Sequence, residues 1–257
     1  MSRPKNLLII QAHPDDAEAW SAGTLALMAE RGWKISIATM TAGGMGSFAM
    51  KEEEAVEIRR SEAAAAAAEI GADYYCFNRR DGFLFDGEAI RIETVNLIRK
   101  VNAGVVITHA PFDYHTDHRT TCTIADAAVL LSNLPNVPSD EKPLELTPVF
   151  YHGMPFNLTD PMGDAVPEPH FFVDISGTPM DKKMAMLSHH KSQQDLMRQM
   201  MGMDDFFGEM KVFNAELGKM TGVKHAECYW QHLGGGYPRN AVIQDEISEF
   251  ICHRKQT

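Results

Sequence analysis

The chain has 257 residues, of which 44% are hydrophobic and 23% charged, as is ordinary for a globular protein with a buried core. Its 35 acidic and 24 basic residues give a formal charge of -11, and basic residues form no run longer than a pair such as Arg59-Arg60 or Lys182-Lys183. Binding to nucleic acid phosphates needs a basic footprint, so we expect no nucleic-acid partner.

The cysteines and the apolar segments indicate where the protein works. Four scattered cysteines have neither zinc-ribbon nor redox spacing, which favours free thiols in a reducing compartment. The apolar run from Leu7 to Ile10 is too short for a signal peptide, and no stretch approaches the length of a membrane span. We therefore predict a cytoplasmic protein with no membrane partner.

In the first half of the chain, short apolar runs alternate with helix-like segments. A run of six alanines followed by Gly71 is typical of a helix and its end. We expect strands at 7–10, 34–40, 73–77 and 104–109, and helices at 17–31, 51–70, 88–102 and 120–131. This alternation predicts βαβ units and an α/β, Rossmann-like fold with a mostly parallel sheet flanked by helices.

The second half has a different pattern. Residues 133–148 contain four prolines and form a loop, and we expect late strands at 149–152 and 171–175, near the edge of the sheet. Residues 179–201 are expected to be helical. We find no internal repeat and no linker, so we interpret residues 1–257 as a single domain.

The first polar cluster, His13-Pro14-Asp15-Asp16, directly follows a buried strand. Ligands bind at the carboxyl ends of the strands in open parallel sheets. An imidazole and a carboxylate three residues apart can converge on one metal ion, and Asp15 between them could take a proton from water. The alternative is that an aspartate at the start of a helix serves only as its N-cap.

The second polar cluster, from His109 to His118, follows the fourth expected strand and precedes a helix. It contains three of the chain's 11 histidines, and His115 and His118 bracket Asp117. A single histidine is more often structural, and we interpret His109 in that way. His115 and His118, on the same sheet edge as the first cluster, are better candidates for a functional site.

Together the clusters supply two imidazoles and one carboxylate for a metal ion. Three protein ligands with an open fourth position are typical of catalytic zinc, whereas structural zinc favours four ligands, often thiolates. We therefore predict a Zn²⁺ cofactor. Fe²⁺ stays open as an alternative, because affinity alone does not fix the identity of a metal.

The residues Ala12 to Asp16 and His115 to His118 resemble the zinc-dependent N-acetylglucosamine deacetylase (PIG-L) family, which includes the phosphatidylinositol-glycan deacetylase and the deacetylases of mycothiol and bacillithiol synthesis. Weaker matching elements follow in the family's order at Gly23–Ala26, Thr41–Gly46, Ile58–Glu62, His190–Gln193 and Ala226–Tyr229. Ala22 departs from the pattern, since a second glycine is usual there. The tail after Tyr229 matches no element of the family.

The resemblance implies zinc ligands at His13, Asp16 and His118. It also implies that Asp15 is the general base and that His115 is the electrophilic or acidic partner. The expected reaction is removal of an acyl group, usually acetyl, from the nitrogen of an amino sugar or its conjugate. Such a protein could also form a homo-oligomer.

Four further features of the sequence have a possible functional and a structural interpretation. We expect Asp117 to hold a protonated His115, and Arg59 to bind substrate unless it only pairs with Glu62 on the helix surface. The glycine-rich loop from Thr41 to Ser47 could let backbone approach a sugar. We interpret the methionine-rich stretch from 180 to 210 as core packing, and the alternative is an adaptable wall or a subunit contact.

Two other functions compete with the deacetylase. One is a non-haem iron enzyme, since His13, Asp15 and a distant histidine match the two-histidine, one-carboxylate pattern. Its usual all-β fold conflicts with the βαβ pattern of this chain. The other is a sugar-binding protein without catalysis, which is disfavoured because every expected catalytic residue is present.

Overall fold

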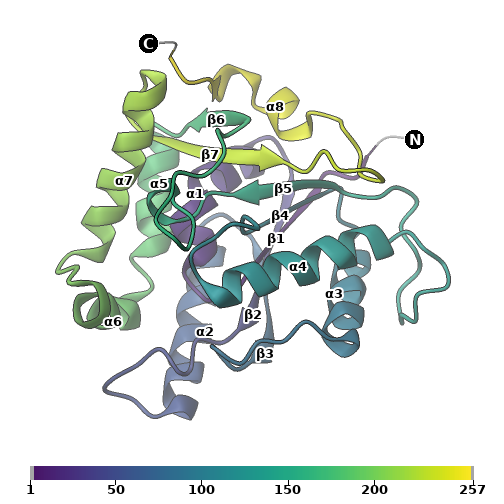
Figure 1. Ribbon diagram of the computed structural model, residues 1–257, viewed down its shortest axis with the longest axis horizontal. Helices are drawn as coiled ribbons and strands as arrows, with labels where there is room; N and C mark the ends of the chain where they lie inside the picture. Colours follow the sequence, from purple (N-terminus) through teal and green to yellow (C-terminus); the bar gives the residue numbers. More distant parts are fainter. Residues whose placement is uncertain (1–2, 256–257) are drawn as a thin grey trace.

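The computed structural model describes residues 3–255, which contain one eight-stranded sheet of order β3-β2-β1-β4-β5-β7-β6-β8 (Figure 1). The first five strands in this order are parallel, and β7, β6 and β8 continue the sheet in antiparallel pairs. The predicted α/β class with a mostly parallel sheet is confirmed. The strands are β1 (Asn6–Gln11), β2 (Lys34–Thr41), β3 (Asp73–Arg79), β4 (Val105–Thr108), β5 (Val149–Gly153), β6 (Phe171–Asp174), β7 (Ala226–Gln231) and β8 (Ile251–Cys252).

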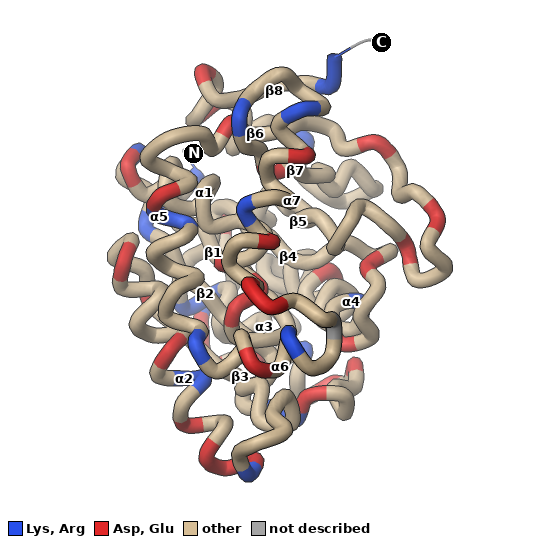
Figure 2. Tube along the Cα trace, turned by 90° about the vertical axis from the view of Figure 1, so that its left-hand side faces the viewer, with Lys and Arg blue, Asp and Glu red and all other residues tan. Residues whose placement is uncertain are grey.

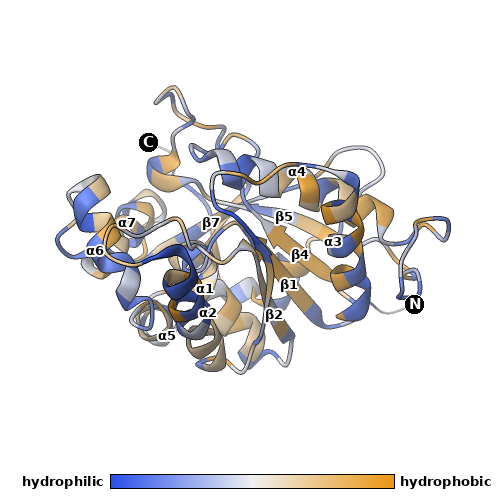
Figure 3. Ribbon diagram, turned by 90° about the horizontal axis from the view of Figure 1, so that it is seen from below, coloured by the Kyte–Doolittle hydropathy of each residue, from blue (hydrophilic) through white to orange (hydrophobic). Residues whose placement is uncertain are grey.

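Helices cover both faces of the sheet. The helices α3 and α4 lie on one face, and α1, α2 and α5 lie on the other (Figures 1 and 3). The helices are α1 (Asp16–Glu30), α2 (Glu52–Ala68), α3 (Glu88–Lys100), α4 (Thr116–Leu131), α5 (Thr178–Leu187), α6 (Lys191–Met201), α7 (Phe206–Thr221) and α8 (Val242–Glu246), with short 3-10 turns at Phe156–Leu158 and Ser248–Phe250.

The central strands are apolar on both sides because both sides are buried. In β1, Leu7 and Ile9 belong to the core under α1 and α5, whereas Leu8 and Ile10 belong to the core under α3 and α4. The strands β1 and β4 are accordingly among the most hydrophobic parts of the molecule (Figure 3). Basic residues are scattered along the chain and do not gather in one stretch (Figure 2).

The second half of the chain differs from the prediction in its strand order. The expected edge strands, now β5 and β6, are interior, because β7 is hydrogen-bonded between them. We did not predict β7, whose six residues are all buried although Glu227 and Gln231 are polar. The edges of the sheet are β3 and β8.

The predicted helix at 179–201 is interrupted. The helix α5 ends at Leu187 and α6 begins at Lys191, and the fully buried His190 lies in the turn between them, 3.5 Å from the carboxylate of Glu18. A third helix, α7, was not predicted. None of the helices in residues 3–255 has the length and apolar character needed to cross a membrane.

A buried ion pair joins α1, α5 and β7. The Lys183 ammonium lies 2.9 Å from the Glu227 carboxylate, and neither side chain is exposed. Glu227 also accepts the backbone N–H groups of Gly23 and Thr24, and Lys183 donates to the carbonyl of Ala19. Two of the weaker elements of the family pattern, at 23–26 and 226–229, therefore serve the packing of these elements.

Candidate metal centre and its cavity

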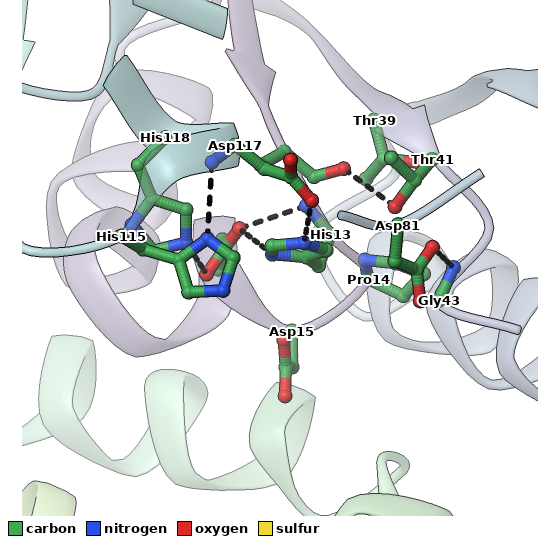
Figure 4. Close-up of polar contacts among 12 residues, drawn as sticks. His13, Pro14, Asp15, Thr39, Thr41, Gly43, Asp81, His115, Asp117 and His118 are labelled. Atoms are coloured by element: carbon green, nitrogen blue, oxygen red, sulfur yellow. Dashed lines mark hydrogen bonds and ion pairs between the residues drawn. The ribbon is translucent and has the colours of Figure 1, made fainter. Parts of the chain in front are cut away.

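The two polar clusters meet at the carboxyl ends of β1 and β4. Strand order 3-2-1-4-5 reverses between β1 and β4, and such a switch point opens a crevice where ligands bind. The turn at 13–16 follows β1, and the segment at 109–118 follows β4. The topology therefore brings together side chains that lie about a hundred residues apart in sequence (Figure 4).

The turn from His13 to Asp16 has a strained backbone. Asp15 adopts a φ of 95°, a region that a residue with a side chain rarely occupies. Such strain costs on the order of 1–3 kcal/mol and is concentrated at functional sites. The carboxylate of Asp16 accepts the His13 N–H at 2.8 Å, while Asp15 makes no side-chain capping bond to α1. Asp15 is therefore free of the capping role that we considered as its alternative.

Asp16 lies between two imidazoles. One of its oxygens is 3.3 Å from Nδ1 of His13, and the other is 3.3 Å from Nε2 of His118. The far nitrogen of each imidazole faces another carboxylate: Nε2 of His13 lies 3.1 Å from Asp117, and Nδ1 of His118 lies 2.9 Å from Asp113. Metal-bound histidines are oriented by just such a carboxylate on the second nitrogen.

The carboxylates of this site favour positive charge on the imidazoles of His13 and His118. Burial opposes positive charge on both imidazoles, yet hydrogen bonds to Asp117 and Asp16 raise the pKa of His13 to about 9. The pKa of His118 is raised to about 10 against the same opposing burial, by the charge of Asp16 and by its contact with Asp113. Because metal binding releases protons from histidine ligands, a divalent cation could take the place of these protons.

His109 also lies close to Asp16, with Nε2 3.4 Å from the carboxylate, and its ring stacks on His118 with 3.8 Å between centroids. Its donor atom falls within 4.8 Å of those of Asp16 and His118. However, Nε2 accepts the backbone N–H of Ala12 at 2.9 Å, so its lone pair is already used. Burial lowers the pKa of His109 to about 4. A structural His109, as expected from the sequence, agrees with this geometry.

His115 is the N-cap of α4, and its Nδ1 accepts the backbone N–H of Asp117 at 3.2 Å. The neutral ring therefore carries its proton on Nε2. Burial, together with the nearby His13 and His118, lowers the pKa of His115 to about 4. The expectation of a protonated His115 held by the Asp117 carboxylate is wrong: the carboxylate contacts His13 and the N–H of Gly82, and only the Asp117 backbone holds His115.

Asp113 is a functional candidate that we missed. It is 1% exposed, contacts Nδ1 of His118 at 2.9 Å and accepts the His115 N–H at 2.9 Å. A carboxylate inside a histidine cluster was a visible signal, but the sequence did not show which carboxylate faces which ring. The reason is that α4 begins at Thr116, four residues before the predicted start.

Arg59 joins α2 to two loops. Its guanidinium donates to the Gly43 carbonyl at 2.9 Å and to the Pro14 carbonyl at 2.8 Å, and lies 3.6 Å from Asp15. A Cβ atom on Gly43 would lie 2.0 Å from this guanidinium, so only glycine fits there. The surface pairing with Glu62 is wrong, since Glu62 accepts hydrogen bonds from Ser192. Arg59 lines the cavity, and its observed bonds position the loops.

A cavity of about 390 Å³ opens beside these groups. We call its polar end the polar floor, formed by His13, Asp15, Asp16, His115 and His118, and its other side the apolar wall, formed by Leu196, Met197, Met200, Met203, Phe206 and Met210. Asp15 points away from the histidines in Figure 4 and lines this cavity. The methionine-rich stretch therefore has two roles. Met180 and Met186 are buried in the core, whereas four later methionines line the cavity.

The fold and the donor set define an α/β protein with a candidate metal centre at its topological switch point. Residues 8–129 match the family model described as PIG-L, GlcNAc-PI de-N-acetylase, so this part of the chain is a PIG-L family domain. The family resemblance found in the sequence is confirmed.

The similar proteins include deacetylases and a hydratase. The chain is 28% identical to diacetylchitobiose deacetylase of Thermococcus kodakarensis over 195 residues, covering 74% of this chain and 70% of that protein. It is 26% identical to 4-oxalmesaconate hydratase of Pseudomonas putida over 200 residues, covering 75% of each. The structure of N,N'-diacetylchitobiose deacetylase from Pyrococcus horikoshii aligns with a TM-score of 0.76 at 24% identity, covering 92% of this chain and 87% of that one.

Proposed function

We propose that the protein is a metal-dependent deacetylase that releases an acyl group, most simply acetate, from the nitrogen of an N-acetylglucosamine-type sugar. One observation carries the proposal: Asp16 and two carboxylate-backed imidazoles converge beside the carboxylate of Asp15 in a cavity. The family membership and the amide hydrolases among the relatives support it.

We propose Zn²⁺ as the metal, held by His13, Asp16 and His118. Two imidazoles and one carboxylate with an open position suit catalytic zinc. The carboxylates behind His13 and His118 supply the second set of contacts that such ligands need. A bound zinc ion would polarise the amide carbonyl and lower the pKa of water.

The side chains of the polar floor perform the proton transfers. Asp15 takes a proton from the attacking water as the new C–O bond forms, and it later gives this proton to the amine nitrogen as the C–N bond breaks. His115 donates its Nε2 proton as a hydrogen bond to the oxyanion of the tetrahedral intermediate, where one donor is worth about 3 kcal/mol. The carboxylate of Asp15 lines the cavity from a residue with a φ of 95°.

Hydration of an unsaturated acid is the second candidate, because the relative from Pseudomonas putida is as similar as the deacetylase. That relative acts, by its name, on a carboxylate. Arg59 is the one arginine or lysine among the described residues that line the cavity, and it is 3% exposed and bound to two carbonyls. Apart from a bound metal ion, a substrate with several carboxylates would find no available arginine or lysine here, so the deacetylase is the better proposal.

The test combines metal content with amine release from N-acetylglucosamine and N,N'-diacetylchitobiose. We expect one metal ion per chain in the wild type and its loss in His118→Ala. Asp15→Asn should keep the metal and lower kcat/KM by roughly 10³-fold, since general acid-base groups contribute 10²–10⁴. The exposed His253 provides a matched control, because His253→Ala should change neither quantity.

The possible results separate the two candidates. Amine release that depends on Asp15 and on the metal would support the deacetylase. A metal-loaded protein that releases no amine but hydrates an unsaturated carboxylate would overturn it in favour of the hydratase. A wild type that binds no zinc would overturn the metal site itself.

Two expectations from the sequence stay predictions. We propose a cytoplasmic location and a homo-oligomeric state, each of which needs its own measurement. Light scattering of the purified chain would measure the oligomeric state.

A further inference from the structure

The apolar wall shares its cavity with the reacting groups. Its six residues come from α6, from α7 and from the loop between them, and they border the same cavity as Asp15 and His115. Trp20 and Phe156 line the cavity as well. A ligand that brings an amide to the polar floor therefore also contacts thioether and aromatic surface.

The helix α6 turns its apolar side toward this cavity. Gln193, Leu196, Met197 and Met200 follow one another at helical spacing and all line it. On the opposite side, Arg198 pairs with Asp195 at 3.2 Å and with Asp204 at 3.6 Å. Met200 stays 66% exposed, as expected of a side chain that borders an open cavity. The apolar side of α6 is thus available to a ligand.

The charges near the cavity are engaged elsewhere. Asp81 accepts the N–H groups of Gly43 and Met45 at 3.0 and 3.1 Å, and Asp117 accepts the N–H of Gly82 at 2.7 Å. Arg59 is bound to its two carbonyls. An anionic ligand group near the wall would remain unpaired, at a cost in binding. An alkyl or aryl group would instead exchange water for apolar contacts.

Methionine side chains suit an apolar group that has no single shape. They are unbranched and polarisable, and they adapt to irregular ligands better than branched side chains do. Four of the six residues in the apolar wall are methionines. A cavity of about 390 Å³ lies within the range typical of sites for small molecules.

We propose that the substrate carries an alkyl or aryl group that lies on the apolar wall while the scissile amide lies on the polar floor. This inference rests on the proposed deacetylase function and specifies its substrate as an amphiphilic N-acyl amino sugar. The apolar group could be the acyl chain or a substituent on the sugar. Both have the same chemistry, and the experiment separates them.

The experiment measures kcat/KM for four synthetic probes, all below micelle-forming concentrations. They are methyl N-acetylglucosaminide, its octyl analogue, the N-octanoyl methyl glycoside, and a glycoside whose alkyl chain ends in a carboxylate. We expect the octyl or the N-octanoyl probe to exceed the methyl probe by at least about tenfold, since each buried methylene contributes roughly a fourfold gain. The carboxylate-ended chain should lose this gain.

Substitutions in the wall test where the gain arises. Met200→Gln combined with Met203→Gln should lower the ratio between the better octyl-bearing probe and the methyl probe by about fivefold or more. Met162→Gln is the matched control, because Met162 is 84% exposed and does not line the cavity. A melting curve for each variant shows that it is folded.

Each outcome decides the matter. A gain on the octyl glycoside assigns the wall to the sugar substituent, and a gain on the N-octanoyl probe assigns it to the acyl chain. Amine release without any gain, or a gain that the double variant retains, would overturn the inference and leave the proposed function intact. If none of the four probes released amine or fatty acid, the proposed function itself would fail.

Discussion

The polar floor and the apolar wall face the same cavity but are held in place differently. On the floor, polar contacts of about 3 Å hold the three imidazoles, as between His118 and Asp113. On the wall, flexible side chains such as Met200 are held by few polar contacts and are partly exposed. On the proposals made above, the floor determines which bond can react, whereas the wall selects the molecule that carries it.

This contrast predicts that changes on the floor affect metal binding and turnover strongly, and that changes on the wall side affect stability and substrate choice modestly. The floor depends on a network in which each group has several partners, so that one substitution disturbs several of them. The wall depends on area and shape, which adapt to substitution.

After Asp15→Asn, the largest effect should come from Arg59→Met. The substitution frees the carbonyls of Gly43 and Pro14 and removes the positive charge beside Asp15. We expect kcat/KM to fall roughly 10²-fold, because a displacement of about 1 Å can cost that much, and the free energy of unfolding to fall by about 3 kcal/mol. Metal affinity should hold, since no ligand changes. Steady-state kinetics, urea unfolding and metal titration measure these quantities.

Arg60→Met is the control for Arg59→Met, because Arg60 is the neighbouring residue on α2 and is exposed. It should leave both kcat/KM and stability close to the wild type. If the two variants behaved alike, the hydrogen bonds from Arg59 to the Gly43 and Pro14 carbonyls would be unimportant for both activity and stability.

The sequence predicted the parallel half of the fold well and the antiparallel half poorly, for a physical reason. The strands β1 and β4 are apolar runs because both faces are buried, and that pattern is visible locally. The strand β7 contains Glu227, whose burial depends on Lys183 and on backbone groups of α1 some 200 residues away. Such compensation between distant segments leaves no local pattern.

The same limit applies to the candidate site. The segment order placed His13, Asp16, His115 and His118 at one sheet edge, and the structure brings them together. The pairing of carboxylates with rings was not predictable, because it depends on the start of α4 and on its rotation. For that reason Asp117 was assigned to the wrong imidazole.

Removing the carboxylate behind one imidazole should have the next largest effect. Asp113→Asn keeps the shape but weakens the contact that orients His118, so the dissociation constant for zinc should rise about 10- to 100-fold. Excess zinc should restore most of the activity. Competition with a chelator measures the affinity. The exposed Asp140 offers a control, as Asp140→Asn should bind zinc like the wild type. An unchanged affinity in Asp113→Asn would refute this role.

The pH dependence of the floor should be moderate and of defined sign. Burial, only partly offset by Arg59, raises the pKa of Asp15 to about 6. The base acts when deprotonated. We therefore expect kcat/KM to reach its full value above this pKa and to fall about tenfold per pH unit below it. A bound cation lowers the pKa of Asp15, so the decline of kcat/KM on the acid side should have its midpoint at or below pH 6. Metal content must be followed in parallel, because acid also protonates the histidines. An acid-side decline of kcat/KM with a midpoint above pH 7 would contradict the role of Asp15 as the base.

The smallest effect should come from the end of the wall helix α6. Gly202 caps this helix with a φ of 67° and has open space where a Cβ would lie, so Gly202→Ala meets only backbone strain. We expect a loss of about 1 kcal/mol and a drop in Tm of roughly 2–4 °C. Gly202→Asn should lose less, because asparagine tolerates this conformation. Zinc affinity should be the same in all three proteins. A fall in zinc affinity in Gly202→Ala would mean that wall and floor are coupled, which would remove the division of roles between them.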